Sequence, residues 1–228
     1  MTRWGMVIDL DRCTACQACV VACRVENNAP PSGPEFAHQG RDISWIRLGS
    51  IKHEEAGNRP GLSLAPLPCM HCENPPCVHV CPTHATTIDE EGMVAQVPAR
   101  CIGCRYCTTA CPYTVRQFNW RLGQWPAPLD QGRNPDVSIR PRGVVEKCTF
   151  CAHRLQRARD RARYEGRELE PDEYVPACVE SCPAEAMFFG DLDDPHSEVA
   201  RQAASPRAFR LMEELGTRPK VIYLSKGE

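Results

Sequence analysis

The feature that most constrains this chain is the number and spacing of its cysteines. Of its 228 residues 16 are cysteine, and they fall into clustered groups. A chain so rich in cysteine is either a disulfide scaffold or a protein whose core is partly metal. Disulfide scaffolds are usually short secreted chains with scattered cysteines, whereas paired CxxC motifs also build zinc sites. A CxxCxxC triplet with a fourth cysteine on another segment suits an iron–sulfur cubane better than either alternative.

The middle of the chain carries two cysteine runs that end alike. The run CIGCRYCTTACP, from Cys101 to Pro112, has three cysteines spaced three apart and a fourth directly before proline. This is the run of bacterial ferredoxins, in which the fourth cysteine serves the other cluster of a pair. The run CMHCENPPCVHVCP, from Cys69 to Pro82, has a wider middle spacing and the same ending. Together they predict a two-cluster module.

The first and last groups repeat this arrangement, which makes the sequence an internal duplication. Residues 13–23 have the CxxCxxCxxxC spacing, and in the last group a long insertion separates Cys148 and Cys151 from Cys178 and Cys182. Crossed ligation within each pair predicts four 4Fe-4S clusters. Their expected ligands are Cys13, Cys16, Cys19 and Cys182; Cys148, Cys151, Cys178 and Cys23; Cys69, Cys72, Cys77 and Cys111; and Cys101, Cys104, Cys107 and Cys81.

Complete ligation by cysteine has a functional consequence. Four thiolates fill the terminal iron positions of a cubane and leave none open for a substrate. The sequence also offers no Ser/His/Asp triad order, phosphate-binding glycine loop or paired-carboxylate motif. We therefore expect electron transfer, with no catalytic residues in this chain.

The predicted fold is α+β, with two pseudo-symmetric bacterial ferredoxin-like lobes and with β-hairpin and helical insertions. Crossed ligation explains how the distant first and last groups can share one lobe. The expected division is residues 1–25 with 142–190 as lobe 1, 26–68 as a hairpin insertion, 69–123 as lobe 2, 124–141 as a connector rich in proline and glycine, and 191–228 as C-terminal helices and a strand packed on the lobes.

Apolar patterns and turn signals predict the individual elements. Expected strands cover residues 4–10, 43–52, 62–67, 85–88, 93–97, 186–189 and 221–224. Expected helices cover residues 18–22, 154–166, 197–204 and 207–215, and residues 26–42 are expected to form a loop.

Charge and hydropathy exclude several classes of partner. The net charge of −2 gives no overall attraction to nucleic acid or an anionic membrane, and no run of 18 apolar residues could span a bilayer. The first residues, MTRWGMVIDLDRC, lack a twin-arginine pair and an apolar leader, so we expect no export address in the chain itself.

The arginine-rich stretch 154–167 is either a solvated basic face or a docking surface for an acidic partner. Acidic residues follow it directly, which argues against nucleic acid.

A few other residues are candidates for a role beside the clusters. Lys147 is either a surface lysine or a cation that raises the potential of the cluster at Cys148. His71 and His79 lie inside a cysteine run, but cysteine already supplies every expected ligand. The tryptophans are expected in the core or at subunit contacts and not as electron relays; they are Trp4, Trp45, Trp120 and Trp125.

The order of the four groups, the strings CMHCENPPCVHVCP and EKCTFCAHR, and GDLDDP after the last group resemble a known family. It is the four-cluster iron–sulfur subunit of membrane-bound molybdopterin oxidoreductases, of the polysulfide, dimethyl sulfoxide and arsenate reductase type. The long insertion before Cys178 and the terminal EELGTRPKVIYL are also similar to the iron–sulfur part of alternative complex III. One departure is Arg24, since the other runs continue with proline after their last cysteine; it affects the local turn and not the ligand.

The resemblance implies two protein partners. One is a catalytic subunit with a molybdenum or tungsten bis-pterin, and the other is a polytopic membrane subunit that binds quinone. It also implies a linear relay, in which the cluster at Cys13 faces the catalytic subunit, followed by those at Cys148 and Cys69, and the cluster at Cys101 lies nearest the quinone. The protein would be peripheral on the membrane, with the periplasmic face favoured over the cytoplasmic one through export with a partner that has a leader.

A second class of function stays open at this stage. The chain could be a free polyferredoxin, or the electron-input subunit of a soluble hydrogenase or formate dehydrogenase. Residues 26–68 and 190–228 extend beyond the cysteine loops and favour the membrane complex, because a free carrier has little need of added docking surface.

Overall fold

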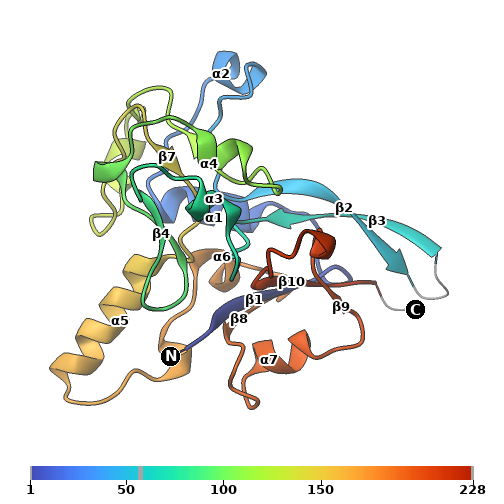
Figure 1. Cartoon of the computed structure of the whole chain (residues 1–228). Helices are drawn as coiled ribbons and strands as arrows, with labels where there is room; N and C mark the ends of the chain where they lie inside the picture. Colours follow the sequence, from blue (N-terminus) through green and yellow to red (C-terminus); the bar gives the residue numbers. More distant parts are fainter. Residues whose placement is uncertain (1, 56–58, 227–228) are drawn as a thin grey trace.

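The computed structural model describes residues 2–55 and 59–226 and contains the predicted mixture of helices and strands. A four-stranded sheet, in the order β8-β1-β10-β9, joins the two ends of the chain (Figure 1). The central strand β1 (Trp4–Asp9) is antiparallel to β8 (Met187–Asp191) and parallel to β10 (Val221–Leu224), which pairs with β9 (Ala208–Phe209). All of β1 is buried, as its apolar sequence predicts.

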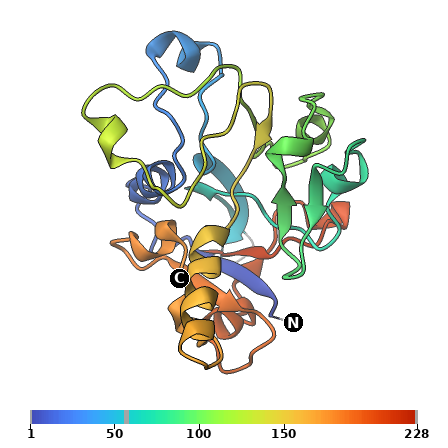
Figure 2. The ribbon, with the colours of Figure 1, turned by 90° about the vertical axis from the view of Figure 1, so that its left-hand side faces the viewer.

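Short helices carry the cysteine groups and lie in two pairs. Helix α1 (Ala18–Glu26) packs against α6 (Ala177–Glu180), and α3 (Pro76–His79) packs against α4 (Tyr106–Thr109). Figure 2 shows the pairs apart, with α1 in dark blue on one side and the green segments of α3 and α4 on the other. The predicted helix 18–22 is thus confirmed and extends further.

Two predicted hairpins are present. In the central module, β4 (Thr86–Ile88) pairs with β5 (Val94–Gln96) across the expected turn. The longer hairpin of β2 (Arg47–Glu55) and β3 (Arg59–Leu67) projects from the body in Figure 1. Its strands run further into the expected turn than predicted, and residues 56–58 of that turn lie outside the described residues.

The segment expected as a connector is closed at its base. The strand β6 (Gln117–Phe118) pairs with β7 (Val145–Glu146), so the chain leaves and returns at the same place. Between them lies the 3₁₀ turn η2 (Leu129–Gly132). The other 3₁₀ turns are η1 (Pro98–Arg100), η3 (Pro171–Glu173) and η4 (Glu213–Leu215).

Helix α5 (Ala152–Tyr164) confirms the helix predicted in the arginine-rich stretch. Leu155 and Ala162 form its buried side. Its charged side is paired internally, since arginines 154, 157, 159, 163 and 167 of this stretch form ion pairs with carboxylates of the same protein. One of these partners, Glu91, also accepts a hydrogen bond from Trp4 Nε1 at 3.1 Å. This stretch is therefore part of the folded structure as well as a basic face.

Two sequence predictions are wrong. Residues 26–42 were expected to be loop, but Pro34–His38 form the short helix α2, because a proline at the first turn supplies a helical φ. Residues 207–215 were expected to be helical, but they form β9 and η4. Pairing of β9 with β10 completes the edge of the sheet, and this tertiary contact overrides a weak helical pattern. The helix α7 (Glu198–Ala203) is as expected, with Ser197 accepting a hydrogen bond from Ala200 as its N-cap.

Aromatic rings join the sheet to the last cysteine group. Phe189 of β8 stacks on Trp4 at 5.6 Å between ring centroids and meets Tyr174 edge to face at 5.2 Å. Phe150, which lies between Cys148 and Cys151, contacts Phe189 at 5.2 Å. The cysteine loops are therefore continuous with the main hydrophobic core.

The described helices are all too short or too polar to cross a bilayer.

Candidate metal-cluster sites

Site 1 consists of four cysteines that line one cavity at the start of α1: Cys13, Cys16, Cys19 and Cys182. Ala15 and Gln17 adopt left-handed backbone, with φ of 55° and 67°, which curls the loop around this cavity. The hairpin contributes Leu48 and Pro66 to the cavity wall. Burial raises the pKa of the Cys19 thiol to about 11, with contributions from charge on the other three cysteines. The structure therefore brings the first run and the last cysteine of the sequence together.

Site 2 consists of the cysteines at the other ends of α1 and α6 and at the start of α5: Cys23, Cys148, Cys151 and Cys178. All four are buried. Burial raises the pKa of the Cys23 thiol well above its usual value, and charge on the other three contributes. Metal-free thiols in this position are held neutral, so binding of a metal cluster must release their protons.

The arginine after Cys23 explains a difference between the groups. A proline follows the last cysteine in the other groups, and their short helices α3, α4 and α6 end just before that cysteine. Proline disfavours helical backbone in the residue before it. With Arg24 in that place α1 runs on to Glu26, and Arg24 Nη2 pairs with Asp42 Oδ2 at 2.7 Å.

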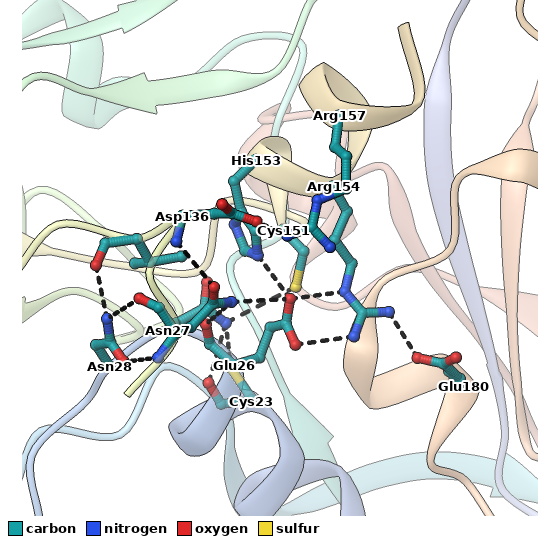
Figure 3. A network of polar contacts seen from close by, with 12 residues as sticks. Cys23, Glu26, Asn27, Asn28, Asp136, Cys151, His153, Arg154, Arg157 and Glu180 are labelled. Atoms are coloured by element: carbon teal, nitrogen blue, oxygen red, sulfur yellow. Dashed lines mark hydrogen bonds and ion pairs between the residues drawn. The ribbon is translucent and has the colours of Figure 1, made fainter. Parts of the chain in front are cut away.

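The continued helix delivers Asn27 to site 2, as Figure 3 shows. Its Nδ2 lies 3.6 Å from Cys23 Sγ and 3.7 Å from Cys151 Sγ, within hydrogen-bond distance of sulfur. The residue is only 2% exposed. A buried amide that donates toward two thiolates stabilises their negative charge.

The neighbouring Glu26 ties α1 to α5 (Figure 3). Arg154 donates to both carboxylate oxygens of Glu26, at 2.7 and 2.8 Å, and His153 Nε2 lies 2.6 Å from Oε1. The hydrogen bonds from Arg154, followed by that from His153, outweigh burial and lower the pKa of Glu26 to about 2. The same guanidinium reaches Glu180 of α6 at 2.6 Å, which fastens three segments around site 2.

Site 3 consists of four cysteines that line a second cavity: Cys69, Cys72, Cys77 and Cys111. Burial raises the pKa of the Cys72 thiol to about 12, with a contribution from charge on Cys69. The buried Arg116 donates from Nη1 to Cys77 Sγ at 3.3 Å. Again the last cysteine of one run joins the first three of its partner run.

Site 4 is built on Cys101, Cys104 and Cys107, with Cys81 as its expected fourth member. Cys101 and Cys107 pack with Cys77, Val94 and Val145 in one apolar cluster. Backbone amides point at two of the sulfurs, since Val145 N lies 3.5 Å from Cys101 Sγ and Thr86 N lies 3.4 Å from Cys81 Sγ.

The loop of site 4 lies against the backbone that leads into β7. At Gly103, where φ is +72°, an added Cβ would stand 2.2 Å from Gly143 O. Only glycine fits this approach and this backbone conformation.

The four sites follow one another through the protein. Charge on Cys19 of site 1 contributes, after burial, to the raised pKa of Cys178 in site 2. Burial, with charge on Cys69 of site 3, raises the pKa of Cys148 of site 2 to about 12. Arg116 donates a hydrogen bond to Cys77 of site 3. Against the effect of burial, charge on Cys77 and on Cys107 of site 4 raises the pKa of Arg116. Sites 1 and 2, sites 2 and 3, and sites 3 and 4 are therefore neighbours.

The donor sets fit a polynuclear cluster. Within residues 2–55 and 59–226, no three His, Cys, Asp or Glu side chains are close enough to hold a single metal ion. At sites 1 and 3 the thiols instead surround a cavity. Soft thiolates around such a space are the ligands that a 4Fe-4S cluster takes.

Lys147 and His71 are buried beside site 2. Lys147 is 1% exposed and donates from Nζ to Cys148 O at 2.7 Å, so the surface-lysine alternative is wrong. His71 accepts from Val94 N at 3.2 Å, and its Nε2 donates to Cys148 O at 3.1 Å. Burial, followed by charge on Lys147, holds the pKa of His71 well below its usual value. Both ring nitrogens are thus occupied, which leaves none for a metal.

The remaining candidates have structural partners. His79 is exposed and its Nε2 lies 3.2 Å from Asn74 Oδ1. Trp4 and Trp45 are buried in the core, as expected, whereas Trp120 and Trp125 are half-buried and stack with arginine side chains.

Sequence reasoning missed Asn27 and Arg116, whose side chains donate hydrogen bonds to cysteine sulfurs. Neither belongs to a cysteine motif, so spacing gave no indication of them. The one signal for Asn27 was the missing proline at position 24, which allows the helix to continue.

Two family models match segments of the chain that carry cysteine runs. A family model described as a 4Fe-4S dicluster domain matches residues 61–127, and one described as a 4Fe-4S binding domain matches residues 4–25. The first match covers sites 3 and 4, and the second covers the first run of cysteines.

Curated relatives match nearly the whole sequence. The menaquinone reductase iron–sulfur cluster-binding subunit of Nitratidesulfovibrio vulgaris is 49% identical over 99% of this chain and 90% of its own length. An iron–sulfur subunit named for dimethyl sulfoxide reductase, from Halobacterium salinarum, is 40% identical over 99% of this chain and 80% of its own length. One of the polypeptides of the polysulfide reductase of Wolinella succinogenes is 34% identical over 97% of this chain and 94% of its own length.

We expect Glu26→Gln to lower the stability of the protein by about 2 kcal/mol, because the change removes the charge from a partly buried, bidentate pair. In a protein of this size that is a fall of roughly 4–8 °C in melting temperature, measured by calorimetry at pH 7. Since the folded-state pKa of Glu26 is lowered to about 2, its contribution is complete above pH ~4.5 and is lost as pH falls toward 2. The difference in melting temperature between the variant and the wild type should begin to decrease below pH ~4.5.

The matched control is Glu198→Gln, which removes an exposed pair with Arg201. Exposed pairs contribute roughly 0–1 kcal/mol, so this variant should melt near the wild type. Equal effects of the two substitutions would contradict the role given to Glu26.

We also expect iron removal by a chelator to unfold the protein, because the thiolates that join distant segments are then left as neutral buried thiols. Far-UV circular dichroism should lose its helical signal, and the thermal transition should broaden. Anaerobic return of iron and sulfide should restore both. A chelated sample with native dichroism and a sharp transition would show that the fold does not depend on metal.

Proposed function

Because this protein belongs to the iron–sulfur subunits of the molybdopterin oxidoreductases, we propose that it relays single electrons within a respiratory complex. Electrons pass through four 4Fe-4S clusters between a molybdopterin catalytic subunit and a quinone-binding membrane subunit. When bound, such clusters supply one-electron redox chemistry. The chain itself holds the clusters, keeps water from the inner ones and presents the outer ones to partners; catalysis belongs to a partner subunit.

The exposure of the cysteines carries this proposal. All four cysteines of site 2 are buried, and so are Cys69, Cys72 and Cys77 of site 3. Cys16 of site 1 and Cys104 of site 4 are exposed. A relay needs protected inner centres and accessible outer ones, and the proposed order assigns the two exposed thiols to its opposite ends.

Crossed ligation and two pseudo-symmetric lobes belong to the same proposal. The helix pair α1 and α6 joins the runs of sites 1 and 2, and the pair α3 and α4 joins those of sites 3 and 4. In each pair, both helices lead from the cysteines of one site toward the last cysteine of the other. We assign lobe 1 to residues 1–25 with 142–190 and lobe 2 to residues 69–123.

Each end of the relay has exposed apolar side chains that suit a protein partner. At site 1 they are Val21 of α1 and Leu62 and Leu64 of β3, and at site 4 they are Ile102 and Tyr106. Following the family order, we assign the site 1 end to the catalytic subunit and the site 4 end to the quinone-binding subunit. A relative named for menaquinone reduction supports the quinone end. The protein would then be peripheral on the membrane, and we favour the periplasmic face.

Crossed ligation predicts that neighbouring cysteines serve different clusters. We expect Cys178→Ser to alter the cluster of site 2 and Cys182→Ser to alter that of site 1, although the two positions are four residues apart. Electron paramagnetic resonance of the reduced complex should show a different signal changed in each variant, with at most about four of roughly sixteen irons lost. Cys13→Ser should reproduce the spectrum of Cys182→Ser. Identical spectra from Cys178→Ser and Cys182→Ser would rule out the crossing, and zinc in place of iron would rule out the relay.

We further expect the protein to stay with membranes when cells are broken without detergent, because its quinone-side partner spans the bilayer. The control is the same protein produced without its partner subunits, which should be recovered in the soluble fraction. Recovery from native cells in the soluble fraction would instead favour a free polyferredoxin or a soluble hydrogenase or formate dehydrogenase subunit.

A further inference from the structure

A buried guanidinium lies between sites 3 and 4. Arg116 lies five positions after Cys111 in the sequence, and its side chain is buried, with 5% of the residue exposed. Its Nη1 donates to Cys77 Sγ at 3.3 Å. Its Nη2 donates to Thr86 Oγ1 at 2.8 Å and also to Gln96 Oε1. These neutral partners belong to β4 and β5, so the hairpin holds the guanidinium in place against the cysteines.

The charge of Arg116 has cysteines as its anionic neighbours. Among the described residues its guanidinium hydrogen-bonds to Cys77, Thr86 and Gln96 and to no carboxylate, and its Nε has no hydrogen-bond partner. Thr86, which accepts from its Nη2, donates its own backbone N–H to Cys81 Sγ of site 4 at 3.4 Å. Cys77 of site 3 also packs with Cys107 of site 4 in one cluster. The guanidinium therefore contacts site 3 directly and lies next to site 4.

An unpaired cation in the interior costs free energy unless an anion compensates it. A 4Fe-4S cluster with four thiolates is anionic, and it gains a further negative charge when it accepts an electron. Inside a protein, a fixed positive charge acts strongly on such a change because the surroundings screen it poorly. A charge beside two clusters favours the reduced form of each, and it offsets part of the repulsion between electrons on neighbouring clusters.

We propose that Arg116 raises the reduction potentials of the clusters at sites 3 and 4 together, as one positioning cation shared by both. This inference rests on the proposed function, since it requires clusters at these sites. At site 2 the sulfurs receive the neutral amide of Asn27, and the buried Lys147 gives its hydrogen bond to the carbonyl of Cys148 and not to a sulfur. With Arg116 between them, the two clusters of the central module accept electrons more readily than the same ligands would allow without that charge.

The test is a redox titration of the purified complex, followed by electron paramagnetic resonance, with Arg116→Gln. Glutamine keeps an amide donor for sulfur and removes the charge. We expect two of the four midpoint potentials to fall, with the ratio of reduced to oxidised cluster at a given potential changed about tenfold, or about 59 mV for one electron. The other two potentials should stay in place. Arg116→Lys, which keeps the charge, should restore most of the difference.

The matched control is Arg105→Gln. Arg105 adjoins Cys104 in the sequence, but it is exposed and its guanidinium stacks on Phe118 and Trp120. Solvent screens its charge, so its removal should move the potentials much less than that of Arg116.

Two results would overturn the inference while leaving the relay intact: iron content and spectra as in the wild type with no change of potential in Arg116→Gln, or an equal fall at all four clusters. If Arg116→Gln fails to load iron, Arg116→Lys is the deciding variant. A tenfold change in the ratio of reduced to oxidised cluster in Arg116→Lys, which keeps the charge, would assign the effect to hydrogen-bond geometry and overturn the inference. A wild-type complex without iron–sulfur signals would overturn the proposed function as well.

Discussion

The fold brings cysteines of distant segments together through two pairs of short helices. Each short helix begins after a cysteine loop and leads toward a cysteine that faces the neighbouring site, so α1 needs α6 and α3 needs α4. The sheet joins the two ends of the chain, and its residues Trp4, Met6 and Tyr223 share one core with the cysteines that these helices carry. The hydrophobic core and the cysteine loops are therefore a single unit.

Burial of so much sulfur sets the electrostatics of the interior. The negative charge of many thiolates would be intolerable there without donors, and backbone amides, the Asn27 side chain and Arg116 point at sulfurs. Lys147 is buried beside site 2 and gives its hydrogen bond to the carbonyl of Cys148. The protein thereby applies a different field at each site, although every ligand is the same.

The sequence predicts what is local and periodic. The buried strand at β1, the hairpin of β4 and β5 and the helix α5 follow from apolar patterns and turn residues that neighbouring positions share. The errors arose where distant contacts decide. Residues 208–209 became a strand because β10 offered an edge, and Arg116 reached Cys77 because β4 and β5 hold it there. The cysteine spacing predicted which residues meet at sites 1 and 3, but no spacing rule contains Asn27.

One departure from the repeated pattern, Arg24 after Cys23, shapes the surroundings of site 2. A proline after Cys23 would have ended α1 as it ends the other short helices, and Glu26 and Asn27 would have left the helix. With Arg24 in its place, the last turn of α1 carries a carboxylate to Arg154 and is followed by an amide that reaches two sulfurs. Arginine in place of proline at this position of a duplicated motif thus has two consequences, both visible in Figure 3. It joins α1 to α5 through Glu26, and it provides a polar side chain at site 2, where all four cysteines are buried.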